Sequence, residues 1–285
     1  RELVMARQTV KSSVTAFLVL QLSFTPSWAD ATRQGDHVLV SHRDVALTVH
    51  PHTLAFERTY NAQSAHSGWV GTGWGSVYET YVSAGTDGTF VVHENGNGPQ
   101  HVYRRLRPDE APSGWILALP TRTLLQDPRC ASGYLQVTAR GYRRGSCSGH
   151  EDFFDQQGRL LSREAWDGYK FEVIYEADRA TRIQDSLGQK LTLHWSEAGK
   201  LTQVRDPAGT SASYEHDGAG NLLKFTDTTG RLIQYAYDDQ RNLTQRSHPD
   251  DRHQQVSILP AHHGWSPLSC LWRDPSESLR VDDTR

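Results

Sequence analysis

The sequence is poor in several features that would indicate a particular class of protein. Its 285 residues include three cysteines and one methionine, and hydrophobic residues make up only 36%. No Cys-x-x-Cys pair occurs, which argues against a zinc ribbon. Formal charges nearly balance at −3, so net charge gives no reason to expect a nucleic-acid partner. Beyond the N-terminal segment, no apolar run is long enough to span a bilayer.

The few cysteines leave one pairing open. Cys130 and Cys147 lie 17 residues apart, whereas Cys270 stands alone near the end of the sequence. In an exported protein, Cys130 and Cys147 could form a disulfide. Two unpaired thiols are the alternative, because spacing along the chain does not fix the distance between the two Cα atoms.

Residues 1–31 have the order of a secretory signal preceded by a few upstream residues. Basic residues come before an apolar run over residues 14–22, and the small residues Ser27 and Ala29 follow it. This order is typical of a cleaved signal peptide. We therefore expect a protein that is secreted, periplasmic or in the cell envelope, with no membrane span after signal cleavage. An uncleaved N-terminal anchor is the alternative.

A pattern recurs every 20–21 residues between residues 153 and 251. Most units open on an aromatic residue, continue with an acid or Ser, and carry Gly four residues after the first position. The opening residues are Phe154, Tyr175, Trp195, His216 and Tyr237. A second series of turn glycines with the same period consists of Gly168, Gly188, Gly209 and Gly230. Two turn signals in each unit predict a tandem β-hairpin repeat.

Apolar and polar residues alternate between these turns. Phe171, Val173 and Tyr175 fall on one face of such a strand, for example. Alternation predicts antiparallel strands with one covered and one wet face. Arg179 and Arg241 stand where other units have the turn glycine, so we expect those two turns to be looser or strained. No segment predicts an amphipathic helix, and the chain should be almost entirely β.

The recurring Tyr-Asp-x-x-Gly-Arg/Asn-Leu pattern resembles the Tyr-Asp (YD) repeat of the Rhs family of bacterial secreted proteins. The motif residues that we single out in the repeats are Gly158, Tyr175, Gly199, Asp217, Gly220, Tyr237 and Asp238. A second resemblance lies upstream, where Arg58, Tyr60 and Asn61 lead to Gly73 and Trp74. It is similar to the domain that precedes YD repeats in this family. We interpret all of these residues as structural, either turn formers or core anchors.

The resemblance divides the chain into four parts. These are the signal and upstream residues 1–31, an N-terminal Rhs-type β domain over 32–152, YD repeats over 153–251, and an irregular or disordered tail over 252–285. Within the N-terminal domain, alternation predicts strands at 54–59, 77–82 and 90–93, with a turn at Asp87-Gly88. Because the period stops at Asp251, our hypothesis is a truncated family member. The fold class is then an all-β chain in which the YD hairpins form a curved, incomplete sheet or shell segment.

The resemblance also implies a function. Complete Rhs proteins build a long β-sheet that closes into a hollow shell around a toxic C-terminal polypeptide, which acts in competition between bacteria. We therefore expect a non-catalytic structural module of an exported protein. In complete relatives its partners would be the toxin cargo and the secretion machinery. No His-Glu-x-x-His motif, EF-hand spacing or Gly-x-Ser-x-Gly elbow occurs, so we expect no catalytic residue, no metal and no cofactor.

The alternative function is a secreted module that binds cell-surface carbohydrate. The aromatic residues Tyr175, Trp195, Tyr235 and Tyr237 could stack on sugars if they were exposed. We expect them instead to pack between layers of the sheet. In that case the substitution Trp195→Ala should destabilise the fold by about 3–5 kcal/mol.

Overall fold

The computed structural model of the chain describes residues 31–34, 37–105, 124–126, 133–146, 148–248 and 251–257. This part is almost entirely β-structure, with one short 3-10 helix, η1 (Val77–Glu79). The prediction of an all-β chain is confirmed. Cys130, Cys147 and Cys270 lie outside the described residues, as does nearly all of the predicted signal segment.

The first four strands form a small antiparallel sheet in the order β1-β2-β3-β4. They are β1 (Ala31–Gln34), β2 (His37–Val49), β3 (His52–Asn61) and β4 (Trp74–Ser76). The inward side chains of β3 alternate with outward ones, so that Leu54, Phe56, Arg58 and Tyr60 are all buried. The strand predicted at 54–59 is therefore confirmed, and its period-2 pattern includes a fully buried arginine.

The other strands form one antiparallel sheet in which each strand pairs with the next along the chain. In order they are β5 (Tyr81–Ala84), β6 (Phe90–His93), β7 (Gln100–Arg105), β8 (Leu124–Gln126), β9 (Tyr134–Thr138), β10 (Gly141–Gly145), β11 (Glu151–Phe154), β12 (Leu160–Glu164), β13 (Lys170–Glu176), β14 (Arg179–Asp185), β15 (Lys190–Trp195), β16 (Leu201–Arg205), β17 (Ser211–His216), β18 (Leu222–Thr226), β19 (Leu232–Tyr237), β20 (Leu243–His248) and β21 (Asp251–Ser257). The pairing runs without a break across residue 152, so the predicted boundary between domain and repeats falls inside β11. Strand β21 includes the first residues of the predicted tail.

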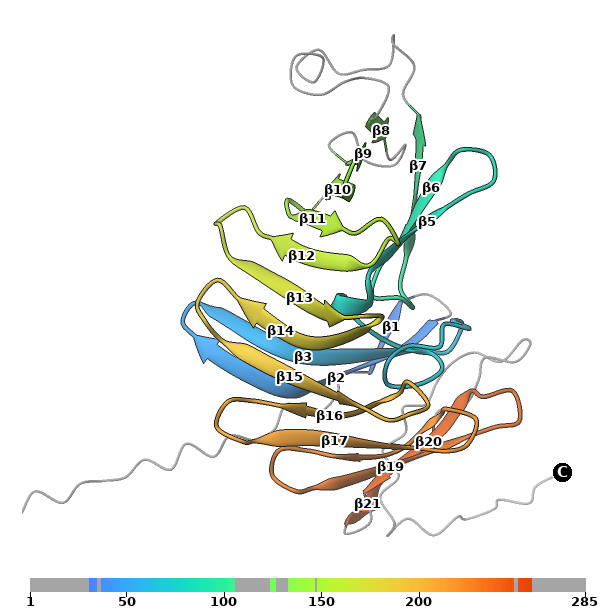
Figure 1. Ribbon diagram of the computed structural model, residues 1–285. Helices are drawn as coiled ribbons and strands as arrows, with labels where there is room; N and C mark the ends of the chain where they lie inside the picture. Colours follow the sequence, from blue (N-terminus) through green and yellow to red (C-terminus); the bar gives the residue numbers. More distant parts are fainter. Residues whose placement is uncertain are drawn as a thin grey trace, which may run out of the picture.

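Among the described residues, the sheet curls back on itself at one point. An isolated bridge joins Tyr81 of β5 to Arg159, and the Val82 N–H donates to the Gly158 carbonyl at 2.8 Å. The bridge links β5 to the β11–β12 hairpin, whereas β13 to β21 continue away from it as an open, curved sheet (Figure 1). No ladder between β5 and β21 occurs among the described strands, so the whole sheet is not closed into a barrel.

The segment predicted as a strand at 77–82 is only partly extended. Residues Val77–Glu79 form η1, and β5 begins at Tyr81. The Thr80 N–H donates back to the Val77 carbonyl, while the Glu79 carboxylate turns inward and accepts the Ser76 hydroxyl. Burial of Glu79 therefore interrupts the strand. The strand predicted at 90–93 coincides with β6, and the turn before it contains Gly88 at φ +80°.

The turn glycines adopt the left-handed conformation that the repeat pattern predicts. In the Asp217 turn, for example, Gly220 has φ +82° and its N–H donates to the Asp217 carbonyl at 3.1 Å. Arg241 is held at φ +66° in the equivalent position, which confirms a strained turn there. The turn that contains Arg179 is also strained, but not at Arg179 itself. Its loop is shorter, with Glu176 paired to Arg179, and Ala177 takes the positive φ instead.

A β-bulge recurs beside the opening residue of each repeat. The register of the strand pairs shifts between Phe153 and Phe154, Ile174 and Tyr175, His194 and Trp195, Glu215 and His216, and Ala236 and Tyr237. An extra residue in one strand bends it and increases its twist. The same local irregularity in every unit therefore accounts for the curvature of the repeat sheet.

Candidate functional site

The largest core of the protein lies where the N-terminal hairpin meets the repeat sheet. In Figure 1 the β2–β3 hairpin lies across the repeat strands. Apolar side chains of β2, β3 and β4 share one hydrophobic cluster with side chains of β13 to β20. The face that the repeats turn inward is thus covered by the chain's own N-terminal region, and this contact is the candidate functional site.

A buried ion pair lies at the centre of this contact. The Arg58 Nε donates to both carboxylate oxygens of Asp44, at 3.1 and 2.8 Å, and both residues are buried. Asp44 reaches inward because it occupies a bulge in β2, where the register shifts between Arg43 and Val45. The repeats complete the network, since Arg58 Nη2 donates to the Tyr235 hydroxyl at 2.9 Å and the Tyr214 hydroxyl donates to Asp44 at 2.6 Å.

Aromatic rings enclose the guanidinium group of Arg58. Its carbon lies 4.5 Å from the ring centroid of Trp74 and 4.4 Å from that of Phe225. Burial alone would lower the pKa of Arg58, but Asp44 and the tyrosines Tyr235 and Tyr214 outweigh it and raise the pKa. The arginine is therefore permanently charged. Cation–π contacts and charged hydrogen bonds offset the desolvation of the pair.

The loop between β3 and β4 binds the opening residues of successive repeats. Trp69 packs edge-on against Trp195, with ring centroids 5.4 Å apart. One unit further along, the His216 Nε2 donates to the Val70 carbonyl at 2.8 Å. In the next unit, the Trp74 indole N–H donates to the Tyr237 hydroxyl at 3.0 Å. The motif aromatics thus form a row that the N-terminal loop follows.

A basic residue at the end of the motif turn links neighbouring elements at this edge. Arg159 donates to the Ala177 carbonyl of the next motif turn at 3.0 Å, and Arg179 donates to the Ser196 and Glu197 carbonyls of the following one. Lys200 donates to the Gly68 carbonyl of the N-terminal loop at 3.0 Å. In the last two units Asn replaces the basic residue and closes its own turn, as in the 2.8 Å bond from Asn221 Nδ2 to Asp217.

A second buried charge cluster joins β11 and β12 to the β6–β7 hairpin. Asp152 is fully buried and pairs with Arg163 at 2.6 Å and with Arg144 at 3.2 Å. Arg144 also contacts Glu94 at 2.5 Å. Burial alone would raise the pKa of Asp152, but His150 and Arg163 hold it below its usual value. These charges neutralise one another, as expected for a structural network.

The structural residues singled out from the sequence fall into two groups. Arg58, Tyr60, Asn61, Gly73 and Trp74 lie where the N-terminal region contacts the sheet. The Tyr60 hydroxyl accepts the Leu243 N–H at 2.8 Å, and a Cβ on Gly73 would strike the Tyr60 ring. Asn61 donates to the Asn97 carbonyl at 2.7 Å.

The second group forms the motif turns and the aromatic row. Gly158, Gly199, Asp217, Gly220 and Asp238 all lie in motif turns. Tyr237 contacts Trp74, and Tyr175 lies under the Arg159 guanidinium, 4.6 Å from its ring centroid. Tyr175, Trp195 and Tyr237 are partly buried and pack against the main core, and Tyr235 is buried within it, as expected for packing between layers of the sheet.

Sequence reasoning missed the polar partners in the interior. Asp44, Glu79 and Asp152 are buried acids, and Tyr214 is the partner of Asp44 from the repeats. One signal was available, because Arg58 occupies an inward position between Phe56 and Tyr60 in an alternating strand. A buried arginine requires a buried acid, yet nothing in the sequence shows which acid lies opposite.

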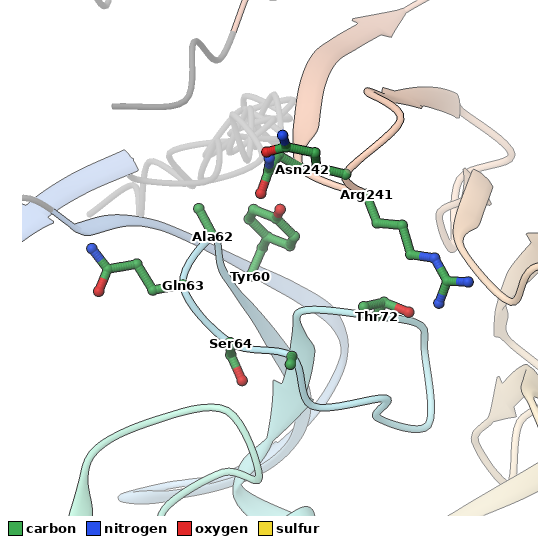
Figure 2. Close-up of a pocket in the computed structure, with 9 residues that line it drawn as sticks. Tyr60, Ala62, Gln63, Ser64, Thr72, Arg241 and Asn242 are labelled. Atoms are coloured by element: carbon green, nitrogen blue, oxygen red, sulfur yellow. The ribbon is translucent and has the colours of Figure 1, made fainter. Parts of the chain in front are cut away.

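A shallow cleft lies at the end of the aromatic row. Tyr60, residues 62–65 and Thr72 form one wall, and the turn at Gln240, Arg241 and Asn242 forms the other (Figure 2). Its volume is about 300 Å³. Within the described residues, no group of three or more His, Cys, Asp or Glu side chains is placed to hold a metal ion. The same part of the chain contains no helix long and apolar enough to cross a membrane.

Comparison with known families agrees with this architecture. The model of the RHS Repeat matches residues 195–224 and 216–253. The resemblance of these repeats to the Rhs family is thereby confirmed over residues 195–253. A second model, described as Domain of unknown function (DUF6531), matches residues 33–103, which include β2 to β6. The RHS matches cover the strands that carry Tyr214, Phe225 and Tyr235, and the DUF6531 match covers the hairpin that packs on them.

Solved structures similar to this RHS-repeat chain are parts of much larger proteins. A Tc holotoxin pore of Photorhabdus luminescens is 12% identical, with a TM-score of 0.33, and the match covers 74% of this chain and 11% of that one. A complex of TcdB2 with TccC3 is 11% identical, with a TM-score of 0.31, over 75% of this chain and 14% of that one. The chain thus spans a small fraction of those proteins. No curated protein matches it in sequence.

Proposed function

We propose that this chain is a non-catalytic wall segment of a β-shell, held in shape by its own N-terminal region. The observation that carries the proposal is the docking of residues 69–74 on the motif residues Trp195, His216 and Tyr237. The residues that define the repeat are thereby used for internal contacts. Their rings and hydrogen-bonding groups fix one sheet face against another, which is a structural function.

In a complete family member, such a segment would form part of a shell that encloses a C-terminal toxin for use against competing bacteria. Three features of the repeats support a role as a wall segment of such a shell. Four of the five motif turns are closed by their own Asp or Ser, at Asp155, Ser196, Asp217 and Asp238. Basic residues link one turn to the next, and bulges curve the sheet. The apolar face is covered by the hairpin, so the segment presents polar strand faces and turns to its surroundings.

Co-expression tests this function directly. The full chain would be produced together with the polypeptide encoded immediately downstream of it, and the pair would be purified through a tag on the chain. We expect the downstream polypeptide to co-purify with the chain. A chain that purifies alone would contradict a role in a shell around that polypeptide.

Export is a second element of the proposal, based on the signal-like order of residues 1–31. The full-length gene expressed in a bacterium should yield a chain shortened by about 30 residues outside the cytoplasm. N-terminal sequencing of the fractionated protein measures this directly. An unprocessed chain recovered from the cytoplasm would contradict export.

A further inference from the structure

The face of the repeat sheet that is turned away from the core carries basic side chains around one threonine. Along β15 the buried leucines face the core, so Lys190, Thr192 and His194 lie on the opposite, outer face. Thr192 pairs with Arg182 of β14 on one side and with Arg205 of β16 on the other. All five residues are exposed. We refer to these five residues as the Thr192 cluster.

The register of the three strands brings the four basic residues within reach of one small ligand. Neighbouring strands lie about 4.8 Å apart, so the backbones of Arg182 and Arg205 are about 10 Å from each other across Thr192. Lys190 and His194 lie on β15 itself, each about 7 Å from Thr192 along the strand. Arginine and lysine side chains are long and flexible enough to span these distances. Their charged ends can therefore converge over the Thr192 hydroxyl.

Among the described residues, no acid neutralises the Thr192 cluster. In this part of the chain, none of its five side chains forms a hydrogen bond or an ion pair. Other charges on the same face are paired in place, since Glu172 contacts Lys170 at 2.7 Å and Glu215 contacts Lys224 at 2.8 Å. The positive charge at the Thr192 cluster is therefore uncompensated, and it attracts anions to one place on the outer face.

The residues that surround the Thr192 cluster distinguish between kinds of anion. Gln184 lies opposite Lys190, Gln203 opposite His194 and Ser211 opposite Arg205. Their amide and hydroxyl groups suit the hydroxyls of a sugar. The cluster itself contains neither an aromatic ring on which a nucleic-acid base could stack nor a large apolar side chain that could enter a lipid layer. The composition therefore favours an acidic saccharide over a nucleic acid or a membrane.

We propose that the Thr192 cluster binds a phosphate group carried by a sugar. Arg182, Lys190 and Arg205 supply three positive charges, which exceed the charge of one carboxylate and suit the two negative charges of a phosphate monoester. The two guanidinium groups can each bind a pair of phosphate oxygens, and the ammonium group binds a further one. The Thr192 hydroxyl and the His194 ring supply neutral hydrogen bonds. This binding site does not depend on the role of the chain in a shell wall.

Nuclear magnetic resonance titration of the full chain tests the site, at about pH 7.5, where a phosphate monoester is a dianion. The probe is glucose 6-phosphate. Glucose is its neutral counterpart, glucuronate is a sugar with a single negative charge, inorganic phosphate lacks the sugar, and vesicles containing phosphatidic acid present the same group on a lipid. We expect saturable shifts of the Thr192 and His194 amides with glucose 6-phosphate, and weaker binding of each of the other probes.

The variants Arg182→Gln and Arg205→Gln separate binding from folding. Both arginines are exposed, so each variant should keep the melting temperature of the original chain, while its affinity for glucose 6-phosphate falls about tenfold, as for loss of a charged hydrogen bond. Lys224→Gln is the matched control, because it removes a cation of the same face that Glu215 already neutralises, and it should leave the affinity unchanged.

Four results would each overturn the proposal. The first is an equal loss of affinity in Lys224→Gln and the two arginine variants, which would mean general attraction between charges. The second is binding of glucose or glucuronate as tight as that of glucose 6-phosphate. The third is equally tight binding of inorganic phosphate, which would exclude recognition of the sugar. The fourth is tighter binding to the phosphatidic acid vesicles, which would identify a lipid headgroup as the ligand.

Discussion

The repeat turns and the N-terminal hairpin are stabilised by contacts of very different range along the chain. The Asp217 carboxylate accepts the N–H groups of Ala219 and Asn221, which are two and four residues away. In the N-terminal hairpin, by contrast, Asp44 and Arg58 find partners in Tyr214 and Tyr235, at separations of 170 and 177 residues. The turns are therefore determined locally, and the hairpin only by the complete fold.

This difference predicts how the stability of the protein responds to substitutions in the two regions. Loss of one turn removes a few local hydrogen bonds, and the neighbouring hairpins keep their own. Loss of the hairpin contact removes all the N-terminal side chains from the main core, and the apolar face of the repeats has no other cover in the described structure. Substitutions at the hairpin contact should therefore destabilise the protein more than substitutions in the turns.

The largest effect is expected at the buried ion pair. Arg58→Ala leaves the Asp44 carboxylate buried without its countercharge and should lower the free energy of unfolding by about 3–5 kcal/mol. Urea denaturation measures the change. The control is Arg43→Ala in the same hairpin, because Arg43 forms an exposed pair with Glu57 and its loss should change stability by less than about 1 kcal/mol. Similar effects of the two variants would contradict a central role for the Arg58 pair.

A pair of tryptophans tests the aromatic row. Trp195→Ala removes the contact with Trp69 and the 2.6 Å hydrogen bond from its indole to the Ala180 carbonyl. We expect a loss of about 3 kcal/mol, at the low end for buried aromatic residues because Trp195 is only partly buried. Trp166 is 86% exposed, and Trp166→Ala should change stability by less than about 0.5 kcal/mol. A melting curve unaffected by Trp195→Ala would revive sugar stacking at this residue.

Alanine substitutions at two turn glycines distinguish the cost of a positive φ from the cost of a steric clash with a neighbouring strand. Gly158 and Gly230 have φ +84° and +85°, but a Cβ would strike the Val82 carbonyl only at Gly158. Gly230→Ala should therefore cost about 1–2 kcal/mol from its conformation alone. Gly158→Ala should cost more, because it also pushes β5 away from the β11–β12 hairpin. Equal losses in thermal denaturation would mean that the contact between β5 and this hairpin contributes nothing.

The smallest effect concerns pH. Burial lowers the pKa of His216 below its usual 6.5, with Lys200 acting in the same direction, while the hydrogen bond to Val70 and the charge of Asp217 oppose the shift. The unfolded chain therefore binds a proton more readily than the folded protein. The contribution of neutral His216 to stability is fully present above pH 6.5 and is lost as pH falls through the folded pKa.

The variant His216→Gln keeps an N–H donor and removes the titration. Its stability should fall less between pH 7 and pH 5 than that of the original chain, as measured by urea denaturation at each pH. Some dependence should persist because burial and the charge of His66 also lower the pKa of His93. If the stability of the two proteins falls equally between pH 7 and pH 5, then protonation of His216 does not contribute to the pH dependence of the fold.

The sequence predicts the repeats more completely than it predicts the contact that covers them. The spacing of Gly199 and Gly220 and the alternation of Leu191 and Leu193 depend on residues a few positions apart, so the sequence alone predicts turns and strand faces. Arg179 shows the limit even there, because the shorter loop between Glu176 and Arg179 moves the positive φ to Ala177. The helix η1 was missed because the burial of Glu79 depends on Trp69 and Ser76.

By itself, the sequence determined an all-β chain of repeated hairpins and the residues that close each turn, because backbone sterics and Asx hydrogen bonds act within four or five residues. Only the tertiary structure decided what covers the repeats, which acid neutralises Arg58, and that Tyr235 and Tyr237 face inward as partners of the N-terminal region. Those contacts join side chains far apart in the chain. Their geometry exists only once the curved sheet and the hairpin have packed together.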